Sequence, residues 1–414
     1  MTGIPKSSRP TNLLTIKESQ ARKERPMTGL GIWRLGFRPF YLGAALFSSL
    51  AIALWLGTLA GIYIFPDSPH LSPLVWHAHE MVFGFAFAVI AGFLLTAANN
   101  WTGMLPAAGQ PLAALFCCWL MARILLAAGA VSVAAFFDLF FAGLLSLLLF
   151  RVLWLAKLWK NFLILGLVVL IGALNAWFYA RLIDGSAGGA TLYPVEVALF
   201  AMMQLLVIMS GRVIPMFTQN GVPGISVWKP IVLAKLTPIA SALGIIAWLV
   251  FPPRLATLFC VLACLINLIR WLGWKPWRTW RFPMVRVLQL GYFWIPTIFL
   301  FMSLESLGIA SRSLPVHALG VGALGLIIAG MITRTALGHT GRMIIPSGFD
   351  KYFFYLVALA AVTRVIAATP SLQGSPAANP ILLLSGTCWA SGFIVYLYQY
   401  TPWLFRPRID GRPG

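Results

Sequence analysis

Apolar runs of about 20 residues, each long enough to cross a bilayer as a helix, recur along this chain between short polar or basic stretches. The alternation of apolar and polar residues that marks a membrane β-barrel is missing. The pattern therefore predicts an all-α membrane protein with twelve spans. Their expected ranges are 39–62, 77–98, 111–129, 132–152, 161–180, 193–216, 230–250, 254–273, 284–307, 316–337, 352–369 and 380–403.

The composition agrees with an integral membrane protein. Hydrophobic residues make up 60% of the 414 positions and charged residues only 10%, whereas soluble domains carry about 25% charge. Residues 1–30 are polar and basic without an apolar core, so we expect a flexible cytoplasmic tail and not a signal peptide. Because no polar linker interrupts the later spans, residues 31–414 are expected to form a single polytopic domain.

The net charge of +20 first suggests nucleic acid as a partner, but the distribution of the charge excludes it. With the N-terminus inside the cell, 25 of the 30 Lys and Arg residues fall on the inner side. This bias is the positive-inside pattern of membrane proteins, and it also favours contact with anionic lipids. We therefore predict that both termini are cytoplasmic.

The second and tenth spans resemble each other. When His79 is aligned with His317, an offset of 238 residues, Gly92 meets Gly330 without a gap. When the second span is shifted by half of that offset, it aligns with the sixth span. In this alignment Ser210 and the following glycine take the place of Gly92 and the residue before it. The pattern predicts three four-helix units related by an axis along the membrane normal. The alternative is chance recurrence of small residues, which are common in membrane helices.

Ionisable side chains gather at the expected outer ends of these spans. His77, His79 and Glu80 open the second span, and His317 opens the tenth at a similar depth. Ionisable groups inside a membrane are costly and usually face a cavity, a partner or a cofactor. Imidazole is the commonest protein ligand of metals, and two imidazoles on facing helices can hold a haem iron from both sides. We therefore predict a metal or haem site near the outer face.

Only one of the two neighbouring histidines can face that site, because residues two apart on a helix point about 200° apart. The repeat favours His79 as the partner of His317. The small residues below His77 would instead leave room on that side for a flat macrocycle. We favour His79 as the iron ligand. This leaves His77, with Glu80 nearby, for a second metal such as copper or for a hydrogen bond.

Two further groups of charges lie on the spans. At the inner ends, Arg212, Arg334, His339 and Arg342 would bind an anion such as a carboxylate or a lipid phosphate, or would anchor the protein at the cytoplasmic surface.

Arg123 and Asp138 stand on the third and fourth spans, each about a turn and a half from the four-residue turn at 129–132. Antiparallel neighbours would bring these two side chains to the same depth. We therefore predict a buried ion pair with a structural role.

Several of these motifs occur together in one known family. The stretches WHAHEMVFGF (76–85), IAGFLLTAANNWTG (90–103), GRVIPMFT (211–218), HALG (317–320) and TRTALGHTGR (333–342) resemble the NnrS family. The resemblance implies a multi-span protein of the bacterial inner membrane that takes part in the nitric oxide and nitrosative-stress response. It also implies that haem and copper are present.

The three-unit arrangement is also similar to the large subunit of haem-copper oxidases, which carries haem ligands on its second and tenth helices. This chain departs from that pattern, because its expected seventh span, 230–250, contains no histidine. An oxygen-reducing binuclear centre is therefore not expected, and any copper site must be built differently.

The resulting hypothesis is a protein that binds haem b, with copper as a further cofactor, and handles nitric oxide or nitrosyl complexes. His79 and His317 would ligate the iron, and an electron donor in the membrane or periplasm would be a partner. Catalysis and sensing both remain open. The alternative is a transporter for metal ions or protons, because parallel repeats and intramembrane charges are typical of transporters.

Overall fold

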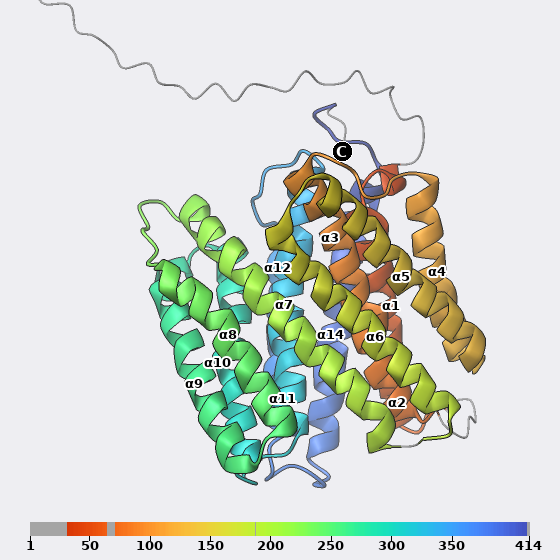
Figure 1. The fold of residues 1–414 in the computed structure, drawn as a ribbon, viewed down its shortest axis with the longest axis vertical. Helices are drawn as coiled ribbons and strands as arrows, with labels where there is room; N and C mark the ends of the chain where they lie inside the picture. The colour runs from red at the N-terminus through yellow and green to blue at the C-terminus, as the bar shows by residue number, and fades with distance from the viewer. Residues whose placement is uncertain (1–30, 64–70, 187, 412–414) are drawn as a thin grey trace, which may run out of the picture.

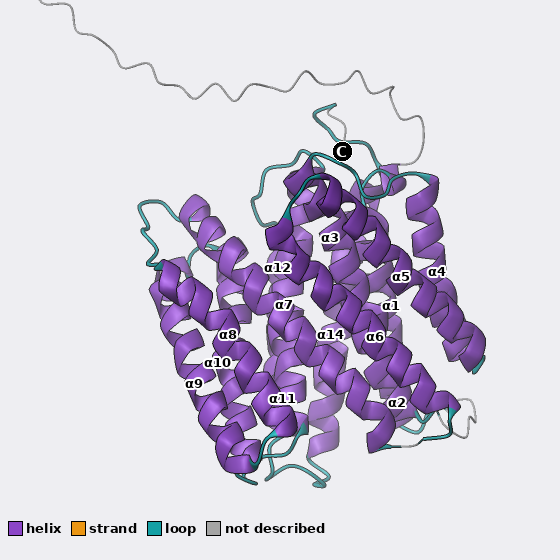
Figure 2. Cartoon of the chain, viewed as in Figure 1, coloured by secondary structure: helices purple, strands orange, loops and turns teal. Residues whose placement is uncertain are grey.

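The computed structural model describes residues 31–63, 71–186 and 188–411 of the chain. Within these ranges the chain forms twelve long helical rods that lie side by side, and it contains no strand (Figures 1 and 2). The all-α prediction is therefore confirmed. The expected tail, residues 1–30, lies outside the described residues.

Ten of the rods are single α-helices. These are α1 (Phe37–Leu59), α4 (Gln110–Ala127), α5 (Val131–Leu155), α6 (Phe162–Ile183), α7 (Gly189–Gly221), α8 (Ile231–Val250), α9 (Pro253–Gly273), α10 (Pro283–Ser306), α13 (Gly348–Ala367) and α14 (Ala378–Phe405). The second and tenth rods each consist of an α-helix, a π-helical turn and another α-helix. Their parts are α2 (Pro73–His79), η2 (Glu80–Ala86) and α3 (Phe87–Thr102), and α11 (Ser313–His317), η5 (Ala318–Leu324) and α12 (Gly325–His339). Short 3-10 turns stand at Gly31–Trp33, Trp159–Asn161 and Pro276–Thr279.

Eleven of the described rods are long and apolar enough to cross a membrane. The remaining rod, α13, carries Asp350, Lys351 and Arg364 within its 20 residues, which makes it more polar than the others. It packs along α14 and against the tenth rod. The span expected at 352–369 is therefore present as a helix of the same bundle.

The second, sixth and tenth spans form the centre of the bundle. In the most apolar window of each, 83%, 67% and 72% of the residues are buried, compared with 33% in α4 and 28% in α9. These three central spans are the ones that the sequence register relates to one another. Each predicted unit thus contributes its second helix to the centre.

The offset of 238 residues also relates the two π-helical turns. η2 begins at Glu80, directly after His79, and η5 begins at Ala318, directly after His317. A π-helical turn is a rare irregularity that often accompanies a functional site. Because the alignment rested only on histidines and small residues, the shared irregularity is independent support for the repeat between these two spans.

Two glycines of the repeat make equivalent close contacts. A Cβ atom added at Gly92 would lie 2.9 Å from Cβ of Phe40 on α1. One added at Gly330 would lie 2.7 Å from Cδ2 of Leu288 on α10. In both units the second helix therefore approaches the first through a glycine, which allows close helix packing.

Candidate functional site

A buried polar cluster lies where the second span meets α4 and α5. Nδ1 of His79 lies 2.9 Å from Oε1 of Glu80. Arg123 of α4 donates from Nη1 to the same Glu80 oxygen at 2.7 Å, and its Nη2 lies 2.5 Å from Oδ2 of Asp138 on α5. All four side chains are at most 2% exposed. The predicted ion pair between Arg123 and Asp138 is therefore confirmed, and it extends to Glu80 and His79.

Helix α6 completes this cluster. Nδ2 of Asn175 and the hydroxyl of Tyr179 both donate to Oδ2 of Asp138, at 3.0 and 3.1 Å. Oδ1 of Asn175 lies 2.9 Å from Nε2 of His79. Sequence reasoning missed both α6 residues. The signal was available, because polar side chains four residues apart share one face of an otherwise apolar helix.

Both ring nitrogens of His79 are engaged in hydrogen bonds. Nδ1 faces a carboxylate oxygen, and Nε2 faces the amide oxygen of Asn175, whose orientation follows from the bond between its amide nitrogen and Asp138. The guanidinium of Arg123 lies between the carboxylates of Glu80 and Asp138. A metal at His79 would have to displace one of these partners.

His317 lies in a different environment. Its Nδ1 lies 2.8 Å from the carbonyl oxygen of Ser313, one turn earlier, and its Nε2 lies 2.8 Å from Nη2 of Arg364 on α13. The carbonyl only accepts and the guanidinium only donates, so Nδ1 carries the proton and Nε2 the lone pair. Metal-binding histidines are commonly held in this way, by a hydrogen bond from the other ring nitrogen to a carbonyl.

His77 is the histidine that accompanies His317. Both rings lie within the range of the charge of Arg364, but among the described residues no hydrogen bond or ring contact joins His77 to His317. The ring of His77 stacks on Trp55 of α1, with the centroids 4.6 Å apart and the planes at 15°. Nδ1 of His77 is buried and has no hydrogen-bond partner in the described part of the chain.

The structure thus places His79 in the cluster with Glu80, while His317 and His77 both lie within the range of the Arg364 charge. The sequence register paired His79 with His317 because they hold equivalent positions in two units. Equivalent positions in a repeat have equivalent neighbours and need not face each other. Since His77 and His79 point to different sides of α2, His77 takes the place that we expected for His79.

An open pocket of about 550 Å³ adjoins His317. It is lined by Ser313 and Arg364, both of which contact His317, and by residues 373–376 between α13 and α14. This volume lies in the usual range of ligand pockets, about 300–1,000 Å³. The guanidinium of Arg364, which contacts His317, therefore lines a space large enough for a ligand.

Two carboxylates at the same end of the bundle do not join the histidines. Arg312 lies 2.8 Å from Oε1 of Glu196 and 3.8 Å from Oε1 of Glu305. Among the residues that the structure describes, no group of three or more His, Cys, Asp or Glu side chains could hold a metal ion. A metal at this end would therefore depend on the two imidazoles.

At the opposite end, two of the predicted anion-binding residues lie in different surroundings. Arg212 of α7 is exposed and donates from Nη1 to Oδ1 of Asn161 at 2.9 Å. Arg334 of α12 is only 9% exposed, and its guanidinium carbon lies 3.8 Å from the centre of the Phe217 ring. One arginine is thus partnered at the surface, while the other is buried against an aromatic ring.

The other two predicted residues, His339 and Arg342, contact the C-terminal part of the chain. The guanidinium of Arg342 lies over the ring of Trp403 at 4.3 Å, and the carbonyl of His339 accepts from Arg408 at 3.4 Å. Burial lowers the pKa of Arg342, and a hydrogen bond to Asp410 raises that of Arg408. The four residues predicted to bind one anion therefore do not form one site.

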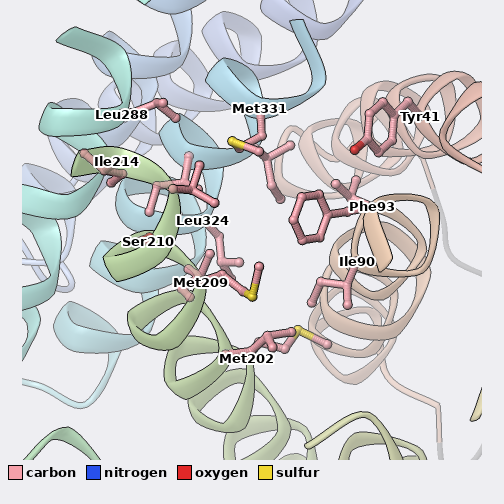
Figure 3. Close-up of a pocket in the computed structure, with 16 residues that line it drawn as sticks. Tyr41, Ile90, Phe93, Met202, Met209, Ser210, Ile214, Leu288, Leu324 and Met331 are labelled. Carbon is pink, nitrogen blue, oxygen red and sulfur yellow. The ribbon is translucent and has the colours of Figure 1, made fainter. Parts of the chain in front are cut away.

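An apolar cavity of about 70 Å³ lies at the centre of the bundle (Figure 3). It is surrounded by α1, α3, α7, α10, η5 and α12, so the second, sixth and tenth spans meet around it. The side chains of Met202, Met209 and Met331 extend toward it from α7 and α12. Among the lining residues only Tyr41 and Ser210 carry hydroxyl groups.

Eleven apolar helical spans, with charged side chains paired between them, define a multi-pass membrane protein. Over residues 31–408 the chain matches the NnrS protein family, and it belongs to that family. The resemblance that the motifs indicated is therefore confirmed. No curated protein sequence matches the chain significantly.

Proposed function

We propose that this NnrS protein binds haem in the bacterial inner membrane and handles nitric oxide or nitrosyl complexes. The chemistry is what the family resemblance implies. The observation that supports it is the imidazole of His317, whose Nε2 lies 2.8 Å from Nη2 of Arg364, with the ring of His77 also within the range of that charge. The pair that the sequence register suggested was His79 and His317.

The residues present fit a haem iron. His317 keeps its proton on Nδ1, bonded to the Ser313 carbonyl, so Nε2 is free to coordinate once Arg364 moves aside. Nδ1 of His77 is a buried nitrogen without a hydrogen-bond partner among the described residues. Histidine is a common axial ligand of haem. Arg364 would then hold a propionate carboxylate, which a guanidinium binds in a bidentate manner.

The two histidines would have unequal roles. Haem bound here would supply an iron that binds nitric oxide. The ring of His317 is oriented by Ser313 and would be the firmly held ligand. The ring of His77 is held by its stack on Trp55 and would be the less firmly held one.

The distribution of basic residues supports the orientation. The sequence pattern assigns 25 of the 30 Lys and Arg residues to the cytoplasmic side, so the end that holds His77 and His317 would face the periplasm. An electron donor on that side or in the membrane would then reach the site. Anionic lipids would contact the basic side.

Copper is the second cofactor that the family resemblance implies. The described residues offer no group of three or more His, Cys, Asp or Glu that could hold it. The arrangement therefore does not fit a copper ion with three such ligands. Element analysis of the purified protein would measure its content of copper and iron.

The visible spectrum of the detergent-purified protein tests the haem proposal. We expect a Soret band that is lost in His317→Ala and lost or shifted in His77→Ala. His339→Ala, at the opposite end of the tenth span, is the matched control and should keep the band. A spectrum that is unchanged in both His317→Ala and His77→Ala would contradict the proposed ligands. Colourless protein that carries metal ions into vesicles would favour the transporter alternative.

A further inference from the structure

The first and third units of the repeat hold corresponding arginines. In the first unit, Arg123 of α4 reaches Glu80, the residue after His79. Helices α4 and α13 begin 238 residues apart, which is the offset that relates His79 to His317. On α13, Arg364 lies three residues, about one helical turn, beyond the position that corresponds to Arg123. Because Arg364 contacts His317, an arginine joins the third helix to the second in both units.

The two arginines differ in their counter-charges. Arg123 lies between the carboxylates of Glu80 and Asp138. In the third unit, Ala318 stands at the position of Glu80, and α14, which takes the place of α5, contains no acidic residue. None of the ion pairs between described residues includes Arg364. Because an unpaired charge is costly where water is scarce, the third unit is suited to an anion from outside the chain.

The open pocket of about 550 Å³ provides the space for such an anion. Among the described residues that line it, only Arg364 is charged. Neutral polar side chains make up much of the remaining lining, namely those of Ser313, Gln373, Ser375 and Asn379. One positive charge matches one carboxylate, and neutral hydrogen-bonding groups match hydroxyl groups on a ligand.

We propose that this pocket binds a small hydroxylated monocarboxylate, for which lactate is the probe. Its carboxylate would accept a charge-assisted hydrogen bond from Nη1 of Arg364, which makes no hydrogen bond within the described residues. Nη2 would stay on Nε2 of His317. The ligand would thus supply the negative charge that Glu80 and Asp138 supply to Arg123. The proposal rests on the repeat and the pocket and does not depend on haem binding.

Saturation-transfer NMR of the full-length protein in detergent, titrated with lactate, tests this site. We expect the wild type to bind lactate, and Arg364→Gln to bind it at least about tenfold more weakly because a charge-assisted hydrogen bond is lost. Arg254→Gln is the matched control, since Arg254 is an exposed arginine at the start of α9, which the sequence pattern assigns to the same side. Asn379→Trp should also lose lactate, because its indole would fill the pocket while Arg364 remains.

Thermal melting in detergent establishes that each variant is folded, and Arg364→Lys, which keeps the charge, should recover part of the binding. Equal binding of lactate by the wild type and Arg364→Gln would overturn the proposal. Full binding by Asn379→Trp would overturn the placement of the ligand in the pocket. Stronger binding of phosphate or nitrite, measured by competition with lactate, would overturn the choice of a carboxylate. The Soret band is recorded on the same samples, so a wild type that shows the band and binds no lactate would overturn this proposal and leave the proposed function standing.

Discussion

Nη2 of Arg364 lies 2.8 Å from Nε2 of His317 and donates to its lone pair. The arginine therefore competes with any metal for this nitrogen. It also keeps the imidazole in the tautomer that a metal would need, since the proton stays on the nitrogen that faces the Ser313 carbonyl.

Replacing Arg364 by Met, which cannot donate, should make His317 more reactive. We expect carbethoxylation of its ring by diethyl pyrocarbonate to become several-fold faster, because the reagent attacks an unprotonated ring nitrogen. Peptide mass spectrometry would measure the rate, with His339 as the internal control. An unchanged rate at His317 would contradict the bond between these two residues.

The buried cluster predicts a large effect for Asp138→Asn. The substitution removes one of two carboxylates and leaves Arg123 and His79 with Glu80 alone. We expect a loss of about 3–5 kcal/mol in the free energy of unfolding, as is typical when one partner of a buried pair is removed. Denaturant unfolding in mixed detergent would measure it. Asp184→Asn, at an exposed carboxylate, is the control, and an equally small effect at both positions would contradict the prediction.

The contacts of the glycines predict how strongly each glycine-to-alanine substitution destabilises the protein. Gly92→Ala should cost about 1–3 kcal/mol, because the new methyl group would lie 2.9 Å from Cβ of Phe40 and 3.3 Å from the backbone of Phe37. Gly330→Ala should cost a similar amount, since the new methyl group would lie 2.7 Å from Cδ2 of Leu288 and 2.8 Å from Cγ1 of Val287, whose β-branched side chain has little freedom to move. Gly143→Ala has no atom within 4 Å and should be neutral or slightly stabilising. Identical melting temperatures for all three would refute this account.

The hydrogen bonds in the loop after α6 predict that the stability of this loop depends on pH. Hydrogen bonds from the side chain and backbone of Ser186 lower the pKa of Asp184. The resulting stabilisation of the loop is present above the ordinary pKa of Asp and is lost as the pH falls through the lowered pKa. Ser186→Ala should raise the pKa of Asp184 toward its ordinary value. Titration of the Asp184 carboxyl carbon by NMR would measure this, and Arg181→Gln should have a smaller effect.

The helices and the pair between Arg123 and Asp138 could be predicted from the sequence. Apolar runs of sufficient length are recognisable without knowledge of their neighbours. Two charges at equal distance from one short turn meet when the two helices fold back on each other. Both inferences needed only local spacing.

The positions of His77 and Arg364 could not be predicted in this way. That of His77 depends on how α2 is rotated against α1, where Trp55 stacks on His77. Arg364 appeared in the sequence only as a basic residue on the outer side. Its contact with His317 depends on the packing of α13 against the tenth span. These contacts join segments that are far apart in the chain, so they cannot be inferred from the spacing of residues in the sequence.

Arg123 and Asp138 are synthesised on consecutive helices that are separated only by residues 128–130. A lone Arg or Asp at the middle of a helix costs about 2.5–3.5 kcal/mol during insertion by the translocon. Because this hairpin closes on itself, the two charges can neutralise each other before α6, which carries Asn175, enters the bilayer. The hairpin would therefore integrate into the bilayer as one unit, and a nascent chain that lacks either charge would be impaired at that step.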